Sequence, residues 1–367
     1  MRFIYNKKGC IIMLFEPIEI AGLHIPNRFV RSATHEWLAG EDGTPTPAIG
    51  DMYEELAKYD VGLIISGYSY VNPAGKSSQR QQGIYNDRFI GPYRQITGQV
   101  HKYGSKIALQ IVHGGRQALV TPEYPHTLAP SAVKDSSSGI TPQAMSEEQI
   151  QQTIEDFAQA VRRAHAAGFD AVQLHVAHGF LLSSFISPYT NQRTDKWGAS
   201  VENRTRIIAE IISRARELVG EDYPIMAKMN ATDGFGDRGL DAPECVDVAA
   251  ALESAGVCAI EVSGGIFEAG DVMSRPGINS PEVEAYFKEY ARMIKQGVGI
   301  PVMLVGGLRS RAVMEQMFAS GCADMVSLCR PLIREPDLVV KFRNGAEEAE
   351  CTSCNRCFDE DGVKCNG

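Results

Sequence analysis

Two histidines stand three residues apart at the end of a short apolar run, where side chains are well placed for chemistry. His175 lies within the run 171–177 and His178 directly follows it. An imidazole can donate a hydrogen bond to a polar ligand or exchange a proton near neutral pH. An isolated pair would more often be structural, but this one precedes a long polar loop, 191–206. The pair is therefore a candidate site for binding a small polar ligand.

Runs of the same kind recur along the chain and alternate with amphipathic segments. The eight runs are 29–34, 61–67, 106–112, 171–177, 224–231, 259–264, 301–307 and 325–330. Short, nearly continuous apolar runs suit strands that are buried on both faces of a parallel sheet. The clearest helix begins after Ser146, where Gln149 completes a capping box, and ends near Gly168.

This alternation predicts an α/β fold, a (β/α)8 TIM barrel. An open doubly wound sheet is less favoured, because no Gly-x-Gly-x-x-Gly follows the first strand. We divide the chain into an N-terminal extension (1–13), the barrel (14–345) and a short Cys-rich C-terminal tail (346–367). Residues 15–28 predict an N-terminal hairpin that caps the bottom of the barrel. Residues 113–145 predict a long excursion on the active-site face.

The composition excludes several classes of partner. A net charge of −9 without a basic run argues against nucleic acid or an anionic membrane. No segment approaches the ~18 consecutive apolar residues that cross a bilayer. The short apolar run near the N-terminus lacks the cleavage site of a signal peptide. We therefore expect a cytoplasmic protein, and also a homo-oligomer.

In such a barrel the C-terminal ends of all strands lie on one face, where active sites are built. The side chains that end the strands include His35, Gln110, His175, His178, Lys228 and Arg330. Gly306 and Gly307 end the seventh run, and glycine lets a backbone approach a phosphate closely. A guanidinium such as that of Arg330 pairs with phosphate charge. The pattern predicts a phosphate-bearing ligand that lies across the mouth of the barrel.

Five segments carry a resemblance to a known family. They are 26–34, 62–67, 109–116, 175–204 and 305–337. Over nearly its whole length the chain resembles the Old Yellow Enzyme family of FMN-dependent NADH:flavin oxidoreductases. It is most similar to the branch of 2,4-dienoyl-CoA reductase and trimethylamine dehydrogenase. The resemblance implies a noncovalent FMN at the barrel mouth and NAD(P)H as the reductant.

The resemblance also implies a role for each site residue. The residues that would bind FMN are Ser32, Ala33, Thr34, Gly67, Gln110, Lys228, Gly306, Gly307, Cys329 and Arg330. Lys228 stands where the family usually has Arg, near flavin N1 and O2. His175 and His178 would donate hydrogen bonds to an oxygen of the substrate. His35, where some relatives have Cys, is a third catalytic candidate.

The default reaction of the family is reduction of an activated C=C bond. Its usual proton donor is a Tyr two residues beyond the second His, and this position is Phe180 here. A phenyl ring cannot deliver a proton, so Tyr68, Tyr189, His35 or water must replace it. Oxidative demethylation or amine dehydrogenation, which needs no such donor, is therefore an open alternative.

Four cysteines crowd the C-terminal tail, at positions 351, 354, 357 and 365. Thiolates at this spacing suit a [4Fe–4S] cluster or a Zn²⁺ ion, and the third alternative is reduced thiols without a metal. The larger relatives carry their cluster cysteines at this place. If Cys351, Cys354, Cys357 and Cys365 hold a cluster, it would pass electrons between the flavin and a partner protein. An FMN and iron–sulfur electron-transfer module for a partner protein is a further alternative to an enzyme that acts on a small substrate.

Overall fold

The computed structural model describes residues 13–367. Residues 1–12, most of the predicted extension, lie outside the described residues. Within residues 13–367, eight parallel strands close into a barrel in which each strand pairs with the next, and the last with the first. The strands are β3 (Phe29–Arg31), β4 (Leu63–Ile65), β6 (Lys106–Val112), β9 (Ala171–Val176), β10 (Ile225–Asn230), β11 (Ile260–Ser263), β12 (Val302–Leu304) and β13 (Met325–Leu328). The predicted (β/α)8 barrel is confirmed.

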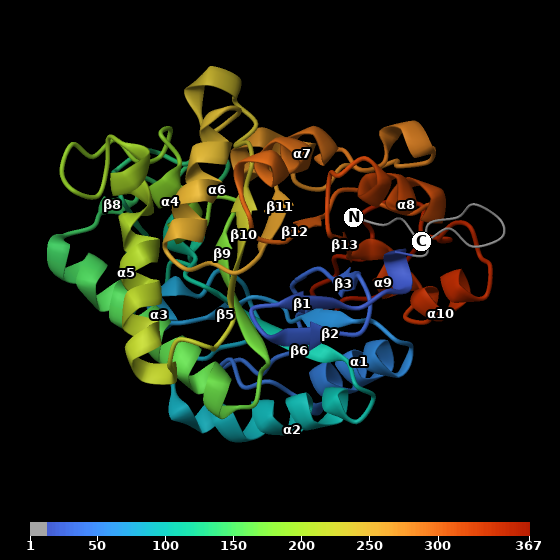
Figure 1. Cartoon of the computed structure of the whole chain (residues 1–367). Coiled ribbons are helices and arrows are strands. Elements are labelled where there is room, and N and C mark those ends of the chain that lie inside the picture. The colour runs from blue at the N-terminus through green and yellow to red at the C-terminus, as the bar shows by residue number, and fades with distance from the viewer. Residues whose placement is uncertain (1–12) are drawn as a thin grey trace.

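Helices lie on the outside of these strands (Figure 1). They are α1 (Pro47–Lys58), α2 (Ile90–His101), α3 (Glu147–Ala166), α4 (Leu181–Ile186), α5 (Val201–Val219), α6 (Glu244–Ser254), α7 (Lys288–Gly297), α8 (Arg311–Ala319), α9 (Arg330–Arg334) and α10 (Leu338–Arg343). Helix α3 begins with the predicted capping box, since Ser146 and Gln149 each accept the other's backbone N–H. These reciprocal bonds satisfy two N–H groups that a helix start otherwise leaves free.

Two separate apolar cores follow from the alternation of side chains along the strands. The larger core fills the space between strands and helices. The smaller one lies inside the barrel and includes Val30, Leu63, Ala108, Ala171, Met226, Ala259, Met303 and Met325. Because every second side chain points inward, residues two positions further along form the next layer up. That layer is largely polar, and it includes Ser32, Gln110, Gln173, Lys228, Glu261 and Ser327.

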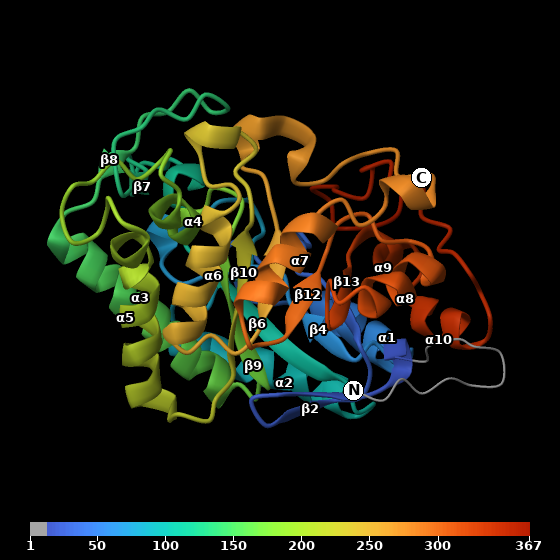
Figure 2. The ribbon, with the colours of Figure 1, turned by 45° about the horizontal axis from the view of Figure 1, so that its top comes forward.

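The bottom of the barrel is closed by the predicted hairpin. Strands β1 (Ile18–Ile20) and β2 (Leu23–Ile25) pair antiparallel, and Gly22 turns the chain with φ +81°. Ile20 and Ile25 join the inner core from below. Figure 2 shows β2 on the lower side of the molecule, with the excursion of β7 (Leu128–Ala129) and β8 (Gln143–Ala144) and the C-terminus on the upper side.

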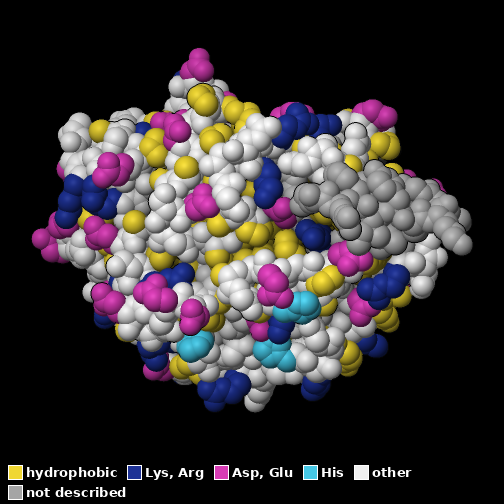
Figure 3. Space-filling model, in the orientation of Figure 1, with side chains coloured by type: hydrophobic (Ala, Val, Ile, Leu, Met, Phe, Trp, Pro, Cys, Tyr) yellow, Lys and Arg dark blue, Asp and Glu magenta, His cyan; other side chains and the backbone are white. Residues whose placement is uncertain are grey.

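The tail contains neither helix nor strand over the described residues 351–367, yet it is bound to the upper face. Gly277 N donates to Ser353 O at 3.0 Å, and Val363 N donates to Glu36 O at 2.8 Å. On the face seen in Figure 3, acidic and basic side chains are interspersed rather than grouped by sign. Over residues 13–367, no helix has the length and apolar character needed to span a bilayer.

Candidate active site

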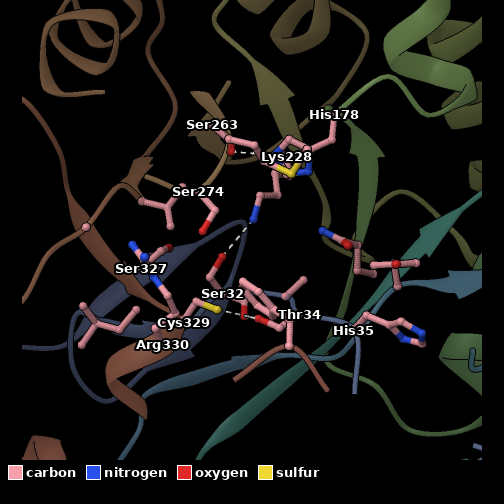
Figure 4. A pocket seen from close by; sticks show the side chains of 18 of the residues that line it. Ser32, Thr34, His35, His178, Lys228, Ser263, Ser274, Ser327, Cys329 and Arg330 are labelled. Atoms are coloured by element: carbon pink, nitrogen blue, oxygen red, sulfur yellow. Dashed lines mark hydrogen bonds between the residues drawn. The ribbon is translucent and has the colours of Figure 1, made fainter. Parts of the chain in front are cut away.

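A cavity of about 310 Å³ opens at the C-terminal ends of the barrel strands. It brings together most of the site residues predicted from the sequence. Those that line it are Ser32, Ala33, Thr34, His35, Gln110, His175, His178, Lys228, Gly307, Cys329 and Arg330. His35 lies at the opposite end from Arg330 (Figure 4). The cavity thus extends from Arg330 at one end to His35 at the other, where aromatic rings line it.

The floor of the cavity carries a buried cation. Lys228 Nζ donates to Ser32 Oγ at 2.9 Å and lies 3.6 Å from Glu261 Oε1, and its side chain is only 5 % exposed (Figure 4). Beside it, Gln110 Nε2 donates to Gln173 Oε1 at 2.7 Å. The Gln110 Oε1 atom is buried without a partner, and so is the Ser327 Oγ atom. Buried polar atoms without partners are costly, so this floor suits a polar ligand that would satisfy them.

Glycine turns and a guanidinium shape the other end. Gly306 and Gly307 have φ +135° and +70°, and a Cβ on Gly307 would lie 2.9 Å from the Tyr286 ring. Only glycine therefore lets this backbone run beside the cavity. Arg330 Nη1 donates to Asn355 Oδ1 at 2.6 Å and Arg275 O at 2.8 Å. These bonds hold the guanidinium at the cavity wall.

Two predicted glycines do not line the cavity. Gly306 is absent from the lining, although its neighbour Gly307 is part of it. Gly67 N donates to Glu36 Oε1 and Tyr53 Oη, both at 2.9 Å. The N–H group of Gly67 is therefore already used within the protein. A side chain there would collide with Glu36, which explains the glycine by packing rather than by ligand contact.

The two histidines meet at a right angle over the cavity. Their ring centroids are 5.1 Å apart, and His178 Nε2 lies 2.8 Å from Ser263 Oγ. Ala177 N donates to His175 Nδ1 at 3.3 Å, so His175 carries its proton on Nε2 when neutral. Burial and the charge of Lys228 hold the pKa of both imidazoles well below the usual range. Both rings are therefore neutral at physiological pH and can each donate one hydrogen bond.

Comparison with known proteins shows which family the chain belongs to. The model of the NADH:flavin oxidoreductase / NADH oxidase family matches residues 13–349. The chain belongs to this family. An NADH oxidase of Thermoanaerobacter brockii is 38 % identical over 348 residues, which are 93 % of this chain and 52 % of that protein. An NADPH dehydrogenase of Bacillus subtilis (strain 168) is 35 % identical over 324 residues, 88 % of this chain and 92 % of that protein.

A solved complex of 2-naphthoyl-CoA reductase with 2-naphthoyl-CoA has a TM-score of 0.87 at 26 % identity, covering 94 % of this chain and 54 % of that one. The chain spans about half the length of this reductase and of the NADH oxidase. The expected membership of the NADH:flavin oxidoreductase family is confirmed. So are FMN as its cofactor and the class of NAD(P)H-dependent flavin oxidoreductases.

The residues present fit FMN. The cofactor of this flavin oxidoreductase family has a polar pyrimidine ring and a phosphate, and the cavity offers a counterpart for each. The unpartnered Gln110 Oε1 and the ammonium of Lys228 lie at the floor. Gly307 and Arg330 lie at the end where the phosphate is expected.

Aromatic rings form the opposite end of the cavity. The Phe180 ring lies 4.8 Å from His175, 5.3 Å from Tyr68 and 6.0 Å from Phe267. Burial raises the pKa of Tyr68, so its hydroxyl keeps its proton. Of the three replacement acids considered, Tyr68 and His35 line the cavity. Tyr189 is not in its lining, and its hydroxyl lies 3.4 Å from Glu268.

Several lining residues were not singled out from the sequence. They are Phe267, Met273, Ser274, Tyr286, Val305, Leu308, Ser327, Leu328, Pro331, Ser353 and Phe358. Ser327 could have been found, because it stands two residues beyond the inward-facing Met325 on its strand. Ser274, Ser353 and Phe358 lie on loops and on the tail, where no periodic signal places them.

The four tail cysteines line one small cavity together with Arg334. Cys351 and Cys357 are buried, whereas Cys354 and Cys365 are exposed. Hydrogen bonds from Arg356 lower the pKa of Cys354 to about 7. Over residues 13–367, no three Cys, His, Asp or Glu side chains are close enough together to hold a metal ion as they stand. The donor set suits a metal, but the thiols would have to move closer together to bind one.

Acid is expected to destabilise the fold through its buried histidines. Burial lowers the pKa of His113 from 6.5 to about 4. Below about pH 6.5 the unfolded chain binds the extra proton first, so stability falls as the pH drops toward about 4. Full loss is about 3 kcal/mol for one such histidine. Urea unfolding at pH 7 and pH 4.5 measures how much of the free energy of unfolding is lost in acid. The loss should be smaller in His113→Asn than in wild type. His24→Asn, which replaces an exposed histidine, should lose as much as wild type. Equal losses in wild type and His113→Asn would contradict this.

Proposed function

We propose that the chain passes a hydride from NAD(P)H, through bound FMN, to a small organic substrate, by default onto an activated C=C bond. The observation that carries this proposal is the neutral pair His175 and His178 at the wall of a cavity whose floor holds Lys228. Membership of the flavin oxidoreductase family supports it. The flavin supplies reversible acceptance and donation of a hydride.

The floor and the two ends of the cavity each have a separate role in this proposal. Lys228 and Gln110 would hold the pyrimidine ring, and the Lys228 charge stabilises negative charge that develops there. Gly307, Cys329 and Arg330 would hold the phosphate. At the aromatic end, the Nε2–H group of His175 and one N–H of His178 donate to a carbonyl oxygen. These bonds draw electrons from the conjugated double bond and prepare its far carbon for hydride attack.

The proton for the second carbon cannot come from Phe180. Tyr68, whose ring centroid lies 5.3 Å from that of Phe180, and His35 both line the cavity, and water is the third source. This departure also supports the second candidate, dehydrogenation of an amine, in which the substrate gives a hydride and needs no acid at this position.

Phe180→Tyr should restore a proton donor and speed alkene reduction. General acids contribute about 10²–10⁴-fold to such steps. We expect a smaller gain here, at least about tenfold, because the neighbouring Tyr68 ring restricts where the new hydroxyl can lie. Anaerobic stopped-flow mixing of reduced enzyme with a cyclic enone measures this step alone. Phe267→Tyr, at the exposed rim, is the matched control and should change the rate little. An unchanged rate in Phe180→Tyr, with normal enone binding, would mean that proton delivery is not limiting.

The two candidate reactions are separated by one anaerobic experiment. The flavin is first reduced with NADPH or NADH and then mixed with 2-cyclohexenone, and separately the oxidised enzyme is mixed with secondary and tertiary amines. Reoxidation by the enone supports the proposed reductase. Bleaching by an amine without NAD(P)H supports the dehydrogenase instead.

We also propose that Cys351, Cys354, Cys357 and Cys365 take a [4Fe–4S] cluster, with Zn²⁺ as the alternative. Their shared cavity, whose lining also includes Arg330 of the flavin pocket, supports this. Iron, acid-labile sulfide and zinc are measured on anaerobically purified protein, and a sample without iron would refute the cluster. A partner that receives electrons, a cytoplasmic location and a homo-oligomer remain proposals. The same holds for the division into residues 1–13, 14–345 and 346–367.

A further inference from the structure

A row of buried hydrogen bonds crosses the barrel under the cavity floor. Gln110 Nε2 donates to Gln173 Oε1 at 2.7 Å, and Gln173 Nε2 donates to Glu261 Oε2 at 3.0 Å. From the other side, Lys228 Nζ donates to Ser32 Oγ at 2.9 Å, and Ser32 Oγ donates to Glu261 Oε1 at 2.6 Å. The two branches meet at one carboxylate.

Glu261 and Gln173 are the residues of this row that do not line the cavity, and Glu261 is the charged one. Its side chain is 0 % exposed, and it is not part of the cavity lining, unlike Ser32, Gln110 and Lys228. It stands directly above the apolar inner core of Met226, Ala259 and their neighbours. A buried carboxylate in such a place is costly unless it is paired and hydrogen-bonded. A role only in packing would be better met by an apolar side chain.

The direction of the hydrogen bonds through Gln173 and Gln110 follows from this carboxylate. An ionised carboxylate can only accept hydrogen bonds, so Gln173 must turn its amide NH₂ toward Glu261. Gln173 then presents its oxygen to Gln110, which must donate its own NH₂. The Gln110 oxygen is left without a partner at the cavity. Glu261 therefore fixes which atom of Gln110 faces the ligand, although two hydrogen bonds through Gln173 separate the two side chains.

The same carboxylate moderates the charge at the floor. Its Oε1 lies 3.6 Å from Lys228 Nζ, on the protein side of the ammonium. Two opposite charges at this distance interact strongly away from water, and their fields partly cancel at a third point nearby. A ligand above Lys228 experiences less positive charge than the ammonium alone would give.

We propose that Glu261 is a positioning residue that sets both the polarity of Gln110 and the net charge that Lys228 presents to the flavin. This inference rests on the proposed FMN site and goes beyond it by assigning a control of the flavin's electron affinity to a residue outside the cavity. Glu261 lowers that affinity, and its neutral replacement raises it.

Glu261→Gln tests this on the holoenzyme with sulfite as the probe. Sulfite adds to the oxidised flavin ring and leaves negative charge on the pyrimidine side, so its affinity reports positive charge there. We expect sulfite to bind at least about tenfold more tightly in Glu261→Gln. The two-electron reduction equilibrium should shift in the same direction, and a tenfold shift equals about 30 mV. Glu261→Asp, which keeps the charge, should stay within about threefold of wild type.

Matched controls keep the test decisive. Glu284→Gln alters another buried carboxylate, one that accepts from Arg309 N and Ser310 N away from the cavity, and should leave sulfite affinity unchanged. If Glu261→Gln alone does not fold, it is combined with Lys228→Met, which removes the opposite charge. The double variant should bind sulfite at least about tenfold more tightly than Lys228→Met. Affinity within twofold of its parent in both backgrounds would overturn the inference, whereas a wild type that binds no FMN would overturn the proposed function instead.

Discussion

Replacement of Lys228 by Met is expected to slow reduction of the bound flavin by NAD(P)H by about 10²–10³-fold, the usual cost of removing one preorganised charge stabiliser. The ammonium is buried at the cavity floor, where water cannot substitute for it. Negative charge that develops on the pyrimidine ring would then face a methyl thioether. Anaerobic stopped-flow absorbance at the flavin band measures the rate.

Lys106→Met is the control for the Lys228 change. Lys106 begins β6 at the bottom of the barrel and pairs with Asp170 at 3.5 Å, so its loss should change the rate little. Circular dichroism and FMN content would show that each variant is folded and loaded. A Lys228→Met enzyme reduced within threefold of the wild-type rate would contradict the role given to this cation.

Loss of a member of the histidine pair should slow reduction of the substrate by a similar factor. We expect His175→Ala to lower kcat/KM for a cyclic enone by about 10²-fold, because the Nε2–H donor to the carbonyl oxygen is removed. Both rings are neutral over the whole range near pH 7, since their pKa values lie well below 6.5. Binding of an uncharged carbonyl ligand should therefore be constant between about pH 6 and pH 8.

His113→Asn provides the comparison for His175→Ala. His113 is buried close to the site but is absent from the cavity lining, and its Nδ1 accepts from Gly115 N at 3.0 Å. Asn can offer an oxygen in the same place, so kcat/KM should remain within about threefold. Equal losses in the two variants would indicate a general packing effect, and a titration of binding near pH 6.5 would show that the pair is not neutral.

The elements of this fold could be predicted because their signals are local. The run 106–112 became β6 with the same bounds, and Ser146 with Gln149 gave the start of α3. The barrel then brings the strand ends together, so His175, Lys228 and Arg330 meet although they are far apart in the sequence. In a closed barrel of parallel strands, the C-terminal ends of all strands lie on the same face, so side chains at these ends must lie there too.

Contacts that depend on tertiary packing could not be predicted in the same way. Gly67 was expected to face the flavin, but Glu36 and Tyr53 take its N–H from behind. Ser353 reaches the cavity because the tail folds back, and nothing in its local sequence indicates this. Glu261 was visible as a charge inside an apolar run, but its meaning required the bond directions around Gln173.

The decisive experiment is the visible spectrum of the purified protein, reconstituted with FMN if necessary, before and after anaerobic addition of NADPH and of NADH. A barrel-mouth FMN site predicts about one bound FMN per chain, with a flavin absorbance that bleaches on addition of one or both nucleotides and returns with air. A protein that binds no FMN after reconstitution, or whose bound flavin neither nucleotide bleaches, would contradict the proposed function.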